Sequence, residues 1–470
     1  MARRHDENTL RIWHRAHPPS LKLRRTAVAL AEAGRVIVRI IDSFLRFTDS
    51  REVRVNGQQF MPLLRVLHRW IGISIAIPVV LVAVSGGLLL FKDPYHRWRF
   101  PELSRPITAG ELSGYGALLE RIEREFEGEI RLVRFPRDGA NAFLVYLADG
   151  SEAFVPPGSG DVLSRWHPHE SLPAFLFQLH AHLLSGTPGE VVNGFIAVFL
   201  VFLGLTGLIL WWPRRAAAFR LTRAIPRSVA PGDLLRSHAA SGALLVLPIL
   251  LFAGTGAGLV FYEPASRVAS AWLDPKPPEE PSAVVMPSTV PRRSWKVILQ
   301  TVRHTLPEAG PTMYYPGSPT NAVMTFRKSL PGELHPNGRS YVLVDPYRAE
   351  VVQAIDARSQ GAGTRLMHAL YPVHAATVGG LALTVMAIVA TVGLTYLAVG
   401  GSWAFLSRSS RRAVRSVPGP LVPPSGVPAS GSLSPRSLSP RSRVRRSLVR
   451  RSLVSLVPWS LRPGSRRPGP

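Results

Sequence analysis

Residues 191–212 read VVNGFIAVFLVFLGLTGLILWW, a run without a charged side chain. A helix needs about 20 such residues to cross the hydrocarbon core of a bilayer. Three further uncharged apolar runs have the same character: Ile71–Phe91, Ala239–Tyr262 and Ala375–Leu406. A buried helix of a soluble domain is usually shorter and carries a polar stripe. The sequence therefore predicts a mainly α membrane protein with four transmembrane helices.

Basic residues are unevenly distributed between the segments that link the four runs. The net charge is +26, and the connector at 213–236 holds six arginines against one acid, Asp233. The chain after Trp403 is rich in arginine and has no acid. The positive-inside rule therefore places this connector and both termini in the cytoplasm and the two long loops outside. We expect the basic residues to contact membrane lipid and not nucleic acid.

Both long loops show the same order of predicted elements. In the first, helical spacing at 112–127 precedes strand-like alternation at 130–135, 142–147 and 152–155. In the second, a helix at 295–306 precedes strands at 313–315, 322–326, 341–344 and 351–355. The chain is therefore predicted to consist of two repeats, each a span, an outward α+β module and a second span.

These patterns divide the chain into nine segments. The predicted segments are a basic cytoplasmic arm with an amphipathic helix (1–60), span 1 (61–92), outward module 1 (93–188), span 2 (189–212), the basic connector (213–236), span 3 (237–262), outward module 2 (263–374), span 4 (375–406) and a cytoplasmic tail (407–470). The tail is predicted to be disordered, because Arg, Ser and Pro dominate it and cannot bury a core.

Histidines lie at matching places in the two repeats. His68 and His238 precede spans 1 and 3 on the cytoplasmic side, and His180 and His374 precede spans 2 and 4 on the outward side. A six-coordinate b-type haem needs two neutral imidazoles from facing helices, with a flat apolar cleft between them. We predict two haems b, one held by His68 and His238 and the other by His180 and His374.

Other interpretations of the histidines remain open. His182 could replace His180, and His368 could replace His374. Histidines at a membrane interface can also simply bond headgroups or backbone carbonyls. Small residues inside the spans are predicted mainly to let helices pack closely. They are Ser85-Gly86-Gly87, Thr206-Gly207, Thr255-Gly256 and Val392-Gly393.

Several classes of chemistry are excluded or unsupported. The chain has no cysteine, which excludes Cys-ligated iron–sulfur clusters, thiol catalysis and covalent c-type haem. It contains neither a P-loop nor an HExxH helix, and no arrangement of nucleophile and base is evident. No catalytic residue is therefore assigned, and electron or ligand transfer is favoured over hydrolysis.

Three motifs point to a family. They are Leu67-His-Arg-Trp-Ile-Gly72, Thr206-Gly-Leu-Ile-Leu-Trp-Trp-Pro213 and Val344-Asp-Pro-Tyr-Arg-Ala-Glu-Val351. With these motifs the chain resembles the PepSY-associated transmembrane helix proteins over roughly residues 60–405. The resemblance implies four membrane helices with small outward PepSY-type modules. Its better-understood members resemble bacterial inner-membrane ferric-siderophore reductases with two b haems.

The resemblance also implies functional residues. His68, His180, His238 and His374 are the positions that match the recurrent histidines of the family. Span 3 opens with Arg236-Ser-His-Ala239, where the family pattern is of the aspartate–leucine–histidine–arginine type, which weakens the match at His238.

Three functions follow as hypotheses. The first is a multi-pass inner-membrane oxidoreductase that reduces an outer acceptor, a ferric siderophore or another ferric chelate. Its electrons would come from a quinol or a separate reductase, because the sequence shows no NAD or flavin motif. The second is a non-enzymatic membrane protein whose PepSY-like modules bind or regulate a periplasmic protein. The third is a haem or metal transporter, disfavoured because no broken helix or midplane acid is predicted.

Overall fold

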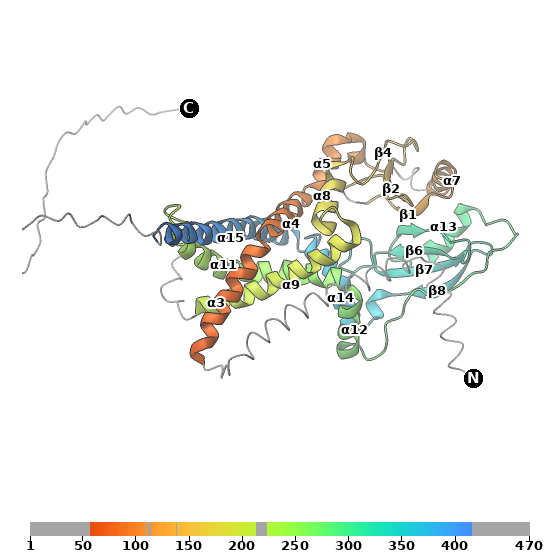
Figure 1. Ribbon diagram of the computed structural model, residues 1–470. Coiled ribbons are helices and arrows are strands. Elements are labelled where there is room, and N and C mark those ends of the chain that lie inside the picture. Colours follow the sequence, from red (N-terminus) through yellow and green to blue (C-terminus); the bar gives the residue numbers. More distant parts are fainter. Residues whose placement is uncertain (1–56, 109, 111–113, 138, 213–222, 416–470) are drawn as a thin grey trace, which may run out of the picture. The chain divides into compact units, whose positions relative to one another are not determined.

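The computed structural model (Figure 1) describes residues 57–108, 110, 114–137, 139–212 and 223–415. The predicted amphipathic helix of the arm, most of the basic connector and the predicted disordered tail lie outside these residues. The helices are α3 (Gly57–Ser74), α4 (Ala76–Leu89), α5 (Lys92–Arg99), α7 (Tyr115–Glu125), α8 (Leu172–His182), α9 (Gly186–Trp211), α11 (Pro231–Val260), α12 (Tyr262–Leu273), α13 (Trp295–His304), α14 (Ala362–His374) and α15 (Gly380–Arg415), with short 3₁₀ turns at Pro101–Ser104 and Ala357–Ser359.

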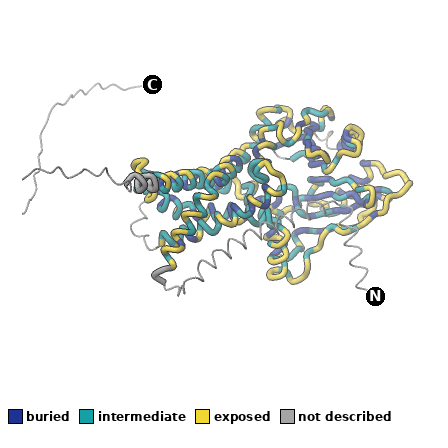
Figure 2. The backbone as a smooth tube through the Cα atoms, in the orientation of Figure 1, coloured by how far each residue is buried: buried dark blue, intermediate teal, exposed yellow. Residues whose placement is uncertain are grey.

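Three of these helices are each long and apolar enough to cross a membrane. They are α9, α11 and the Gly380–Ser407 part of α15. Only 17%, 17% and 11% of their most apolar segments are buried inside the protein. Figure 2 shows the same contrast, with buried residues concentrated in the strands and few of them on the long helices. Apolar side chains left exposed to this extent need a hydrocarbon environment, so the prediction of a membrane protein is confirmed.

The first predicted span differs from the expected continuous helix. Helices α3 and α4 pass the length and composition test only together, and their axes are bent by 60° at Ile75. Pro78 explains the break, because it lacks the N–H that would bond to the Ser74 carbonyl and its ring collides with that carbonyl. The first predicted span is therefore not one continuous helix. The other argument against a transporter, the absence of acids within the apolar runs, is unaffected.

The strands of both outward loops form one antiparallel sheet of eight strands. Its order is β4-β3-β2-β1-β5-β6-β7-β8. The strands are β1 (Ile130–Arg134), β2 (Phe143–Leu147), β3 (Glu152–Val155), β4 (Ser164–Trp166), β5 (Pro311–Tyr315), β6 (Met324–Lys328), β7 (Ser340–Asp345) and β8 (Glu350–Ile355). The two predicted modules are therefore joined edge to edge, through pairing of β1 with β5 (Val133 with Tyr314, Arg134 with Met313).

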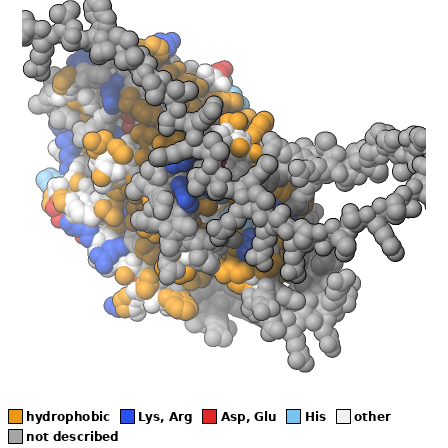
Figure 3. Space-filling view, turned by 90° about the vertical axis from the view of Figure 1, so that its left-hand side faces the viewer, with side chains coloured by type: hydrophobic (Ala, Val, Ile, Leu, Met, Phe, Trp, Pro, Cys, Tyr) orange, Lys and Arg blue, Asp and Glu red, His pale blue; other side chains and the backbone are white. Residues whose placement is uncertain are grey.

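The two faces of the sheet have different characters. Helices α7 and α13 cover one face, and alternate residues such as Phe143, Val145 and Phe326 form the main core with them. The opposite face carries two smaller apolar clusters, one around Phe154 and one around Leu343. It also holds the polar side chains of Arg134, Arg327 and Tyr146. Figure 3 views the molecule from the side of the long helices, where hydrophobic side chains make up much of the described surface.

Candidate functional site

The four histidines predicted to bind haem lie in two pairs. The ring centroids of His68 and His238 are 6.4 Å apart, with the ring planes at 85°. Those of His180 and His374 are 5.9 Å apart, with the planes at 39°. Metal–imidazole bonds are about 2 Å long, so two rings on opposite sides of one metal ion have centroids about 6 Å apart. Both pairs have this separation.

The pairs lie near opposite ends of the long helices. His238 is close to the start of α11, whereas Gly256, which contacts the ring of His374, is near its end. These two positions are about 27 Å apart along the helix axis, close to the thickness of the hydrocarbon core. One pair therefore lies toward each end of α11.

Hydrogen bonds fix the protonation of three of the rings. The Nδ1 atoms of these rings bond to carbonyl oxygens of neighbouring helices: His180 to Val82 (2.9 Å), His238 to Leu397 (3.1 Å) and His374 to Phe252 (3.1 Å). A carbonyl oxygen can only accept, so Nδ1 must carry the proton. The other nitrogen, Nε2, then keeps its lone pair, which is the form that ligates a metal.

His68 also carries its proton on Nδ1, but the acceptor is a hydroxyl group and not a carbonyl. Its Nδ1 lies 2.9 Å from Thr206 Oγ1. That hydroxyl donates its own proton to the Phe202 carbonyl at 2.8 Å, so it accepts from His68. Thr255 is the equivalent residue near His374, since its Oγ1 donates to the Leu251 carbonyl and lies 3.1 Å from His374 Nδ1. All four histidines are therefore of the Nδ1–H tautomer.

Each of the four rings lies against a glycine of a neighbouring helix. A Cβ atom added to the glycine would approach the ring Cε1 to 2.6 Å (Gly86, His180), 3.0 Å (Gly256, His374), 3.0 Å (Gly401, His238) and 3.3 Å (Gly207, His68). In three of the four cases the carbonyl that accepts from Nδ1 belongs to the residue one turn before the glycine. The missing side chain thus opens the helix surface so that the ring can reach this carbonyl.

The role predicted for the small residues is therefore incomplete. Gly86, Gly207 and Gly256 were expected to serve helix packing, and the structure places them against histidine rings instead. Gly393 does serve packing, because its added Cβ would meet Leu245. The glycine beside His238 is Gly401, which the sequence analysis did not single out.

The two alternate histidines occupy different surroundings. His182 ends α8, where its Nδ1 lies 3.7 Å from Glu190 Oε2 and its ring packs edge-on against Phe177. His368 lies on α14 beside basic residues, and burial, followed by the charges of Arg339 and Arg327, lowers its pKa to about 4. Neither ring belongs to one of the two pairs described above.

Polar contacts hold the two short helices that carry the outer pair. Asn193 of α9 donates from Nδ2 to the His180 carbonyl at 2.6 Å, which satisfies an end group of α8. Asp274, at the end of α12, accepts from the Gly363 amide and the Thr364 hydroxyl, both at 2.6 Å. Asp274 therefore caps the first turn of α14, whose last residue is His374.

Replacing Asp274 with alanine is expected to loosen α14. Two amide donors of its first turn would lose their acceptor, a change that costs about 1 kcal/mol at a helix N-terminus. The melting temperature of the purified protein should fall by a few degrees, and proteolysis within 362–374 should become faster. The melting temperature of Asp274→Asn, which keeps one acceptor oxygen, should lie between those of the wild type and Asp274→Ala. Equal melting temperatures for all three proteins would contradict this capping role.

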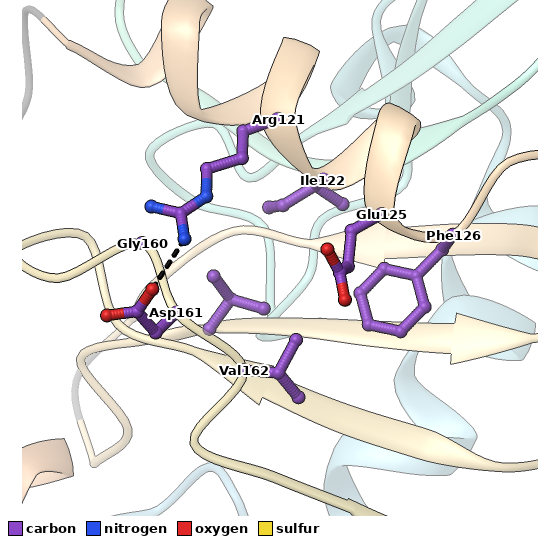
Figure 4. Close-up of a pocket in the computed structure, with 8 residues that line it drawn as sticks. Arg121, Ile122, Glu125, Phe126, Gly160, Asp161 and Val162 are labelled. Atoms are coloured by element: carbon purple, nitrogen blue, oxygen red, sulfur yellow. Dashed lines mark hydrogen bonds and ion pairs between the residues drawn. The ribbon is translucent and has the colours of Figure 1, made fainter.

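The described residues also contain a small hollow that lacks histidine. It encloses about 280 Å³ and is lined by residues of α7, by Val155 of β3 and by 160–162. Figure 4 shows Arg121 and Asp161 forming an ion pair across its edge. It lies in the first module and involves none of the paired histidines, so we assign no role to it.

The described residues hold no group of three or more His, Asp or Glu side chains that could bind a bare metal ion. Each histidine pair can supply two ligands, so a metal between them must bring its other ligands with it. A porphyrin, which supplies four nitrogens around iron, fits this requirement.

Comparison with known protein families identifies the region that contains the histidine pairs. Residues 65–408 match the family model described as the PepSY-associated TM region. The matched part includes all four paired histidines and the four glycines that contact them. No curated protein matches the chain.

Proposed function

The chain belongs to the PepSY-associated transmembrane family, and from this premise we propose that it is a dihaem b electron-transfer protein. In this proposal His68 and His238 bind one haem through Nε2, and His180 and His374 bind the other. Electrons pass from the cytoplasmic side to an outer acceptor, a ferric siderophore or another ferric chelate. Reduction weakens the chelate complex of the iron and releases the metal for uptake.

The observation that carries this proposal is the shared state of the four rings. Their pairwise separations of 6.4 and 5.9 Å suit a metal between two imidazoles. Their Nδ1–H groups all bond to backbone or hydroxyl oxygens. Such bonds orient a metal-ligating imidazole and raise its basicity. Histidines that only anchored helices to headgroups would have no reason to share this arrangement.

The proposed topology rests on charge and on repetition. We take the bent pair α3–α4 as one span, which gives four spans with the arginine-rich connector in the cytoplasm. Both repeats continue beyond their first span with the same pattern, Phe91-Lys-Asp-Pro94 and Phe261-Tyr-Glu-Pro264. These features support two span–module–span units in a bacterial inner membrane, with both termini in the cytoplasm.

The chemistry divides between the cofactor and the chain. When bound, haem supplies one-electron transfer between ferric and ferrous iron. The four imidazoles of the chain would hold the two haems, and their hydrogen bonds fix the tautomer. The two pairs are placed about 27 Å apart along α11. The electron donor is proposed to be a quinol or a separate reductase.

A reduced-minus-oxidised visible spectrum tests the proposal. The full chain, produced with sufficient haem and purified in detergent, should show b-type bands and contain two haems per chain. The bands should reoxidise when a ferric chelate is added to the reduced protein. A His68→Ala/His180→Ala double variant should lose the bands. A colourless wild-type protein that is well folded would contradict the proposal and leave a non-enzymatic regulator as the better hypothesis.

A further inference from the structure

Two buried arginines lie on the sheet face opposite α7 and α13, where the two halves of the sheet meet. Arg134 of β1 pairs with Met313 of β5, and Met313 pairs with Arg327 of β6. Strands are spaced by about 4.8 Å, so the two arginine backbones are about 10 Å apart across the seam. Each arginine is only 7% exposed. One arginine comes from each half of the chain, so the arrangement requires both halves.

Further polar residues surround this seam. Arg137 Nη1 donates to Asn337 Oδ1 at 2.9 Å, and Arg327 donates to the Gly338 carbonyl and lies 3.4 Å from His335 Nδ1. The next residue after Gly338 is Arg339. We call Arg134, Arg137, Arg327, Arg339, His335 and Tyr371 the basic cluster.

The positive charge of the basic cluster is not neutralised by ion pairs. Within the described parts of the chain, none of its four arginines forms an ion pair with a carboxylate. Buried Nε atoms of Arg134 and Arg339 have no hydrogen-bond partner. Asp93 and Glu152 are close enough to act electrostatically on Arg137 and Arg134, but they do not form ion pairs with them. Buried charges without counter-charges are costly, so the site is suited to a negatively charged ligand.

The pKa of His335 is affected by the same excess of positive charge. Its pKa is lowered to about 3 by burial and then by the charges of Arg327, Arg339, His368 and Arg137. Its ring is therefore neutral at physiological pH. A neutral imidazole packed among guanidinium groups adds no compensating negative charge.

The basic cluster is connected to the outer histidine pair. The ring of His335 stacks on Tyr371, with centroids 5.2 Å apart and planes at 27°. Tyr371 lies on α14 one turn before His374, so both project from the same side of that helix. A ligand held by the cluster would therefore lie beside the proposed outer haem site.

We propose that the basic cluster binds carboxylate-type oxyanions, with the arginines as charge-assisted donors. The contacts described above are the evidence for an anion site. The identity of its ligand rests on the proposed function. Two ligands share this chemistry. One is a free anionic ferric chelate, which would make the protein prefer negatively charged complexes over cationic ones. The other is the pair of propionate groups of a porphyrin held by His180 and His374.

Binding of a redox-inactive chelate to the full chain in lipid nanodiscs tests the proposal. The probe is gallium(III) citrate, which is anionic, and the comparison is the cationic gallium(III) complex of desferrioxamine B. The test variants are Arg134→Gln and Arg327→Gln. Arg327→Lys retains the positive charge. Arg137→Gln, at a less buried position, replaces the test variants if they fail to fold. Arg124→Gln, an exposed arginine of α7 on the opposite face of the sheet, is the control. Calorimetry gives the affinity, and the visible spectrum gives the haem content.

Two results support the site and distinguish its ligands. If it holds a free chelate, the glutamine variants should bind gallium citrate about tenfold more weakly while keeping both haems. If it holds propionates, the same variants should lose haem, and the wild type should not bind gallium citrate. Variants that match the wild type in both measurements would overturn the proposal. Because gallium is not reduced, intact binding without any ferric reduction would count only against the proposed reductase function.

Discussion

Replacing His68 with alanine is expected to remove one of the two haems and to leave the other in place. His68 and His238 are the two imidazoles that would hold the inner haem, and removing His68 would leave only His238 to hold it. The outer pair shares no residue with the inner one and lies about 27 Å away along α11. The haem content per chain should therefore fall by about half, and His180→Ala should have the same effect on the outer site.

The two single variants can be distinguished by spectroscopy. The ring planes are at 85° in the inner pair and at 39° in the outer pair, and the electron paramagnetic resonance of a bis-imidazole ferric haem depends on this angle. Each variant should lose one of two distinct signals. His182→Ala on α8 and His368→Ala on α14, the short helices that carry the outer pair, are controls and should keep both haems. Loss of haem from the controls, with retention in His68→Ala and His180→Ala, would reverse the ligand assignment.

The membrane helices were predictable because hydropathy is a local property. The runs at 191–212, 239–262 and 375–406 correspond to α9, α11 and α15. The predicted ends of these helices were less accurate. Helix α15 begins at Gly380 and not at Ala375, since Ala376, Gly379 and Gly380 all have positive φ, which interrupts the helix after α14. The bend at Ile75 depends on Pro78, which the hydropathy of the run does not reveal.

The single eight-stranded sheet could not be predicted from the repeat pattern. The sequence predicts three strands in the first loop and four in the second, and β4 at Ser164–Trp166 is not among them. The pairing of β1 with β5 joins residues about 180 positions apart. Such a pairing is decided by which edges meet in space, and the strand pattern alone does not contain this information. The pattern Phe-x-acid-Pro after spans 1 and 3 was a further signal of repetition that the sequence analysis missed.

The histidine pairs show how far repetition can guide a site prediction. Equivalent places in two repeats suggested which histidines to pair, and the structure brings both pairs within about 6 Å. The choice between His180 and His182 depended on the direction of each ring from α8. The glycine beside each ring was detectable only in part, because Gly401 follows Gly400 and lacks the preceding hydroxyl residue found at Gly86, Gly207 and Gly256.

Replacing Gly86 with alanine is expected to abolish haem binding at the outer site. The new Cβ would lie 2.6 Å from His180 Cε1, a distance that real Cβ contacts essentially never show. The ring would have to move away from α4 and lose its bond to the Val82 carbonyl. The displaced imidazole would no longer keep its position beside the His374 ring, so one haem per chain should be lost while the inner haem remains.

The glycine series should show a graded effect that follows the distances. In Gly256→Ala and Gly401→Ala the added Cβ lies 3.0 Å from the nearest ring carbon, so these variants should weaken haem binding less than Gly86→Ala. In Gly207→Ala this distance is 3.3 Å, and the effect should be the smallest. Gly254→Ala is the matched control on α11, because an added Cβ there meets nothing within 4 Å. Alanine in place of glycine stabilises a helix by about 1 kcal/mol, so a loss of haem cannot come from a weaker helix. If Gly86→Ala and Gly254→Ala retain haem equally well, the contact between ring and glycine is not needed for ligation.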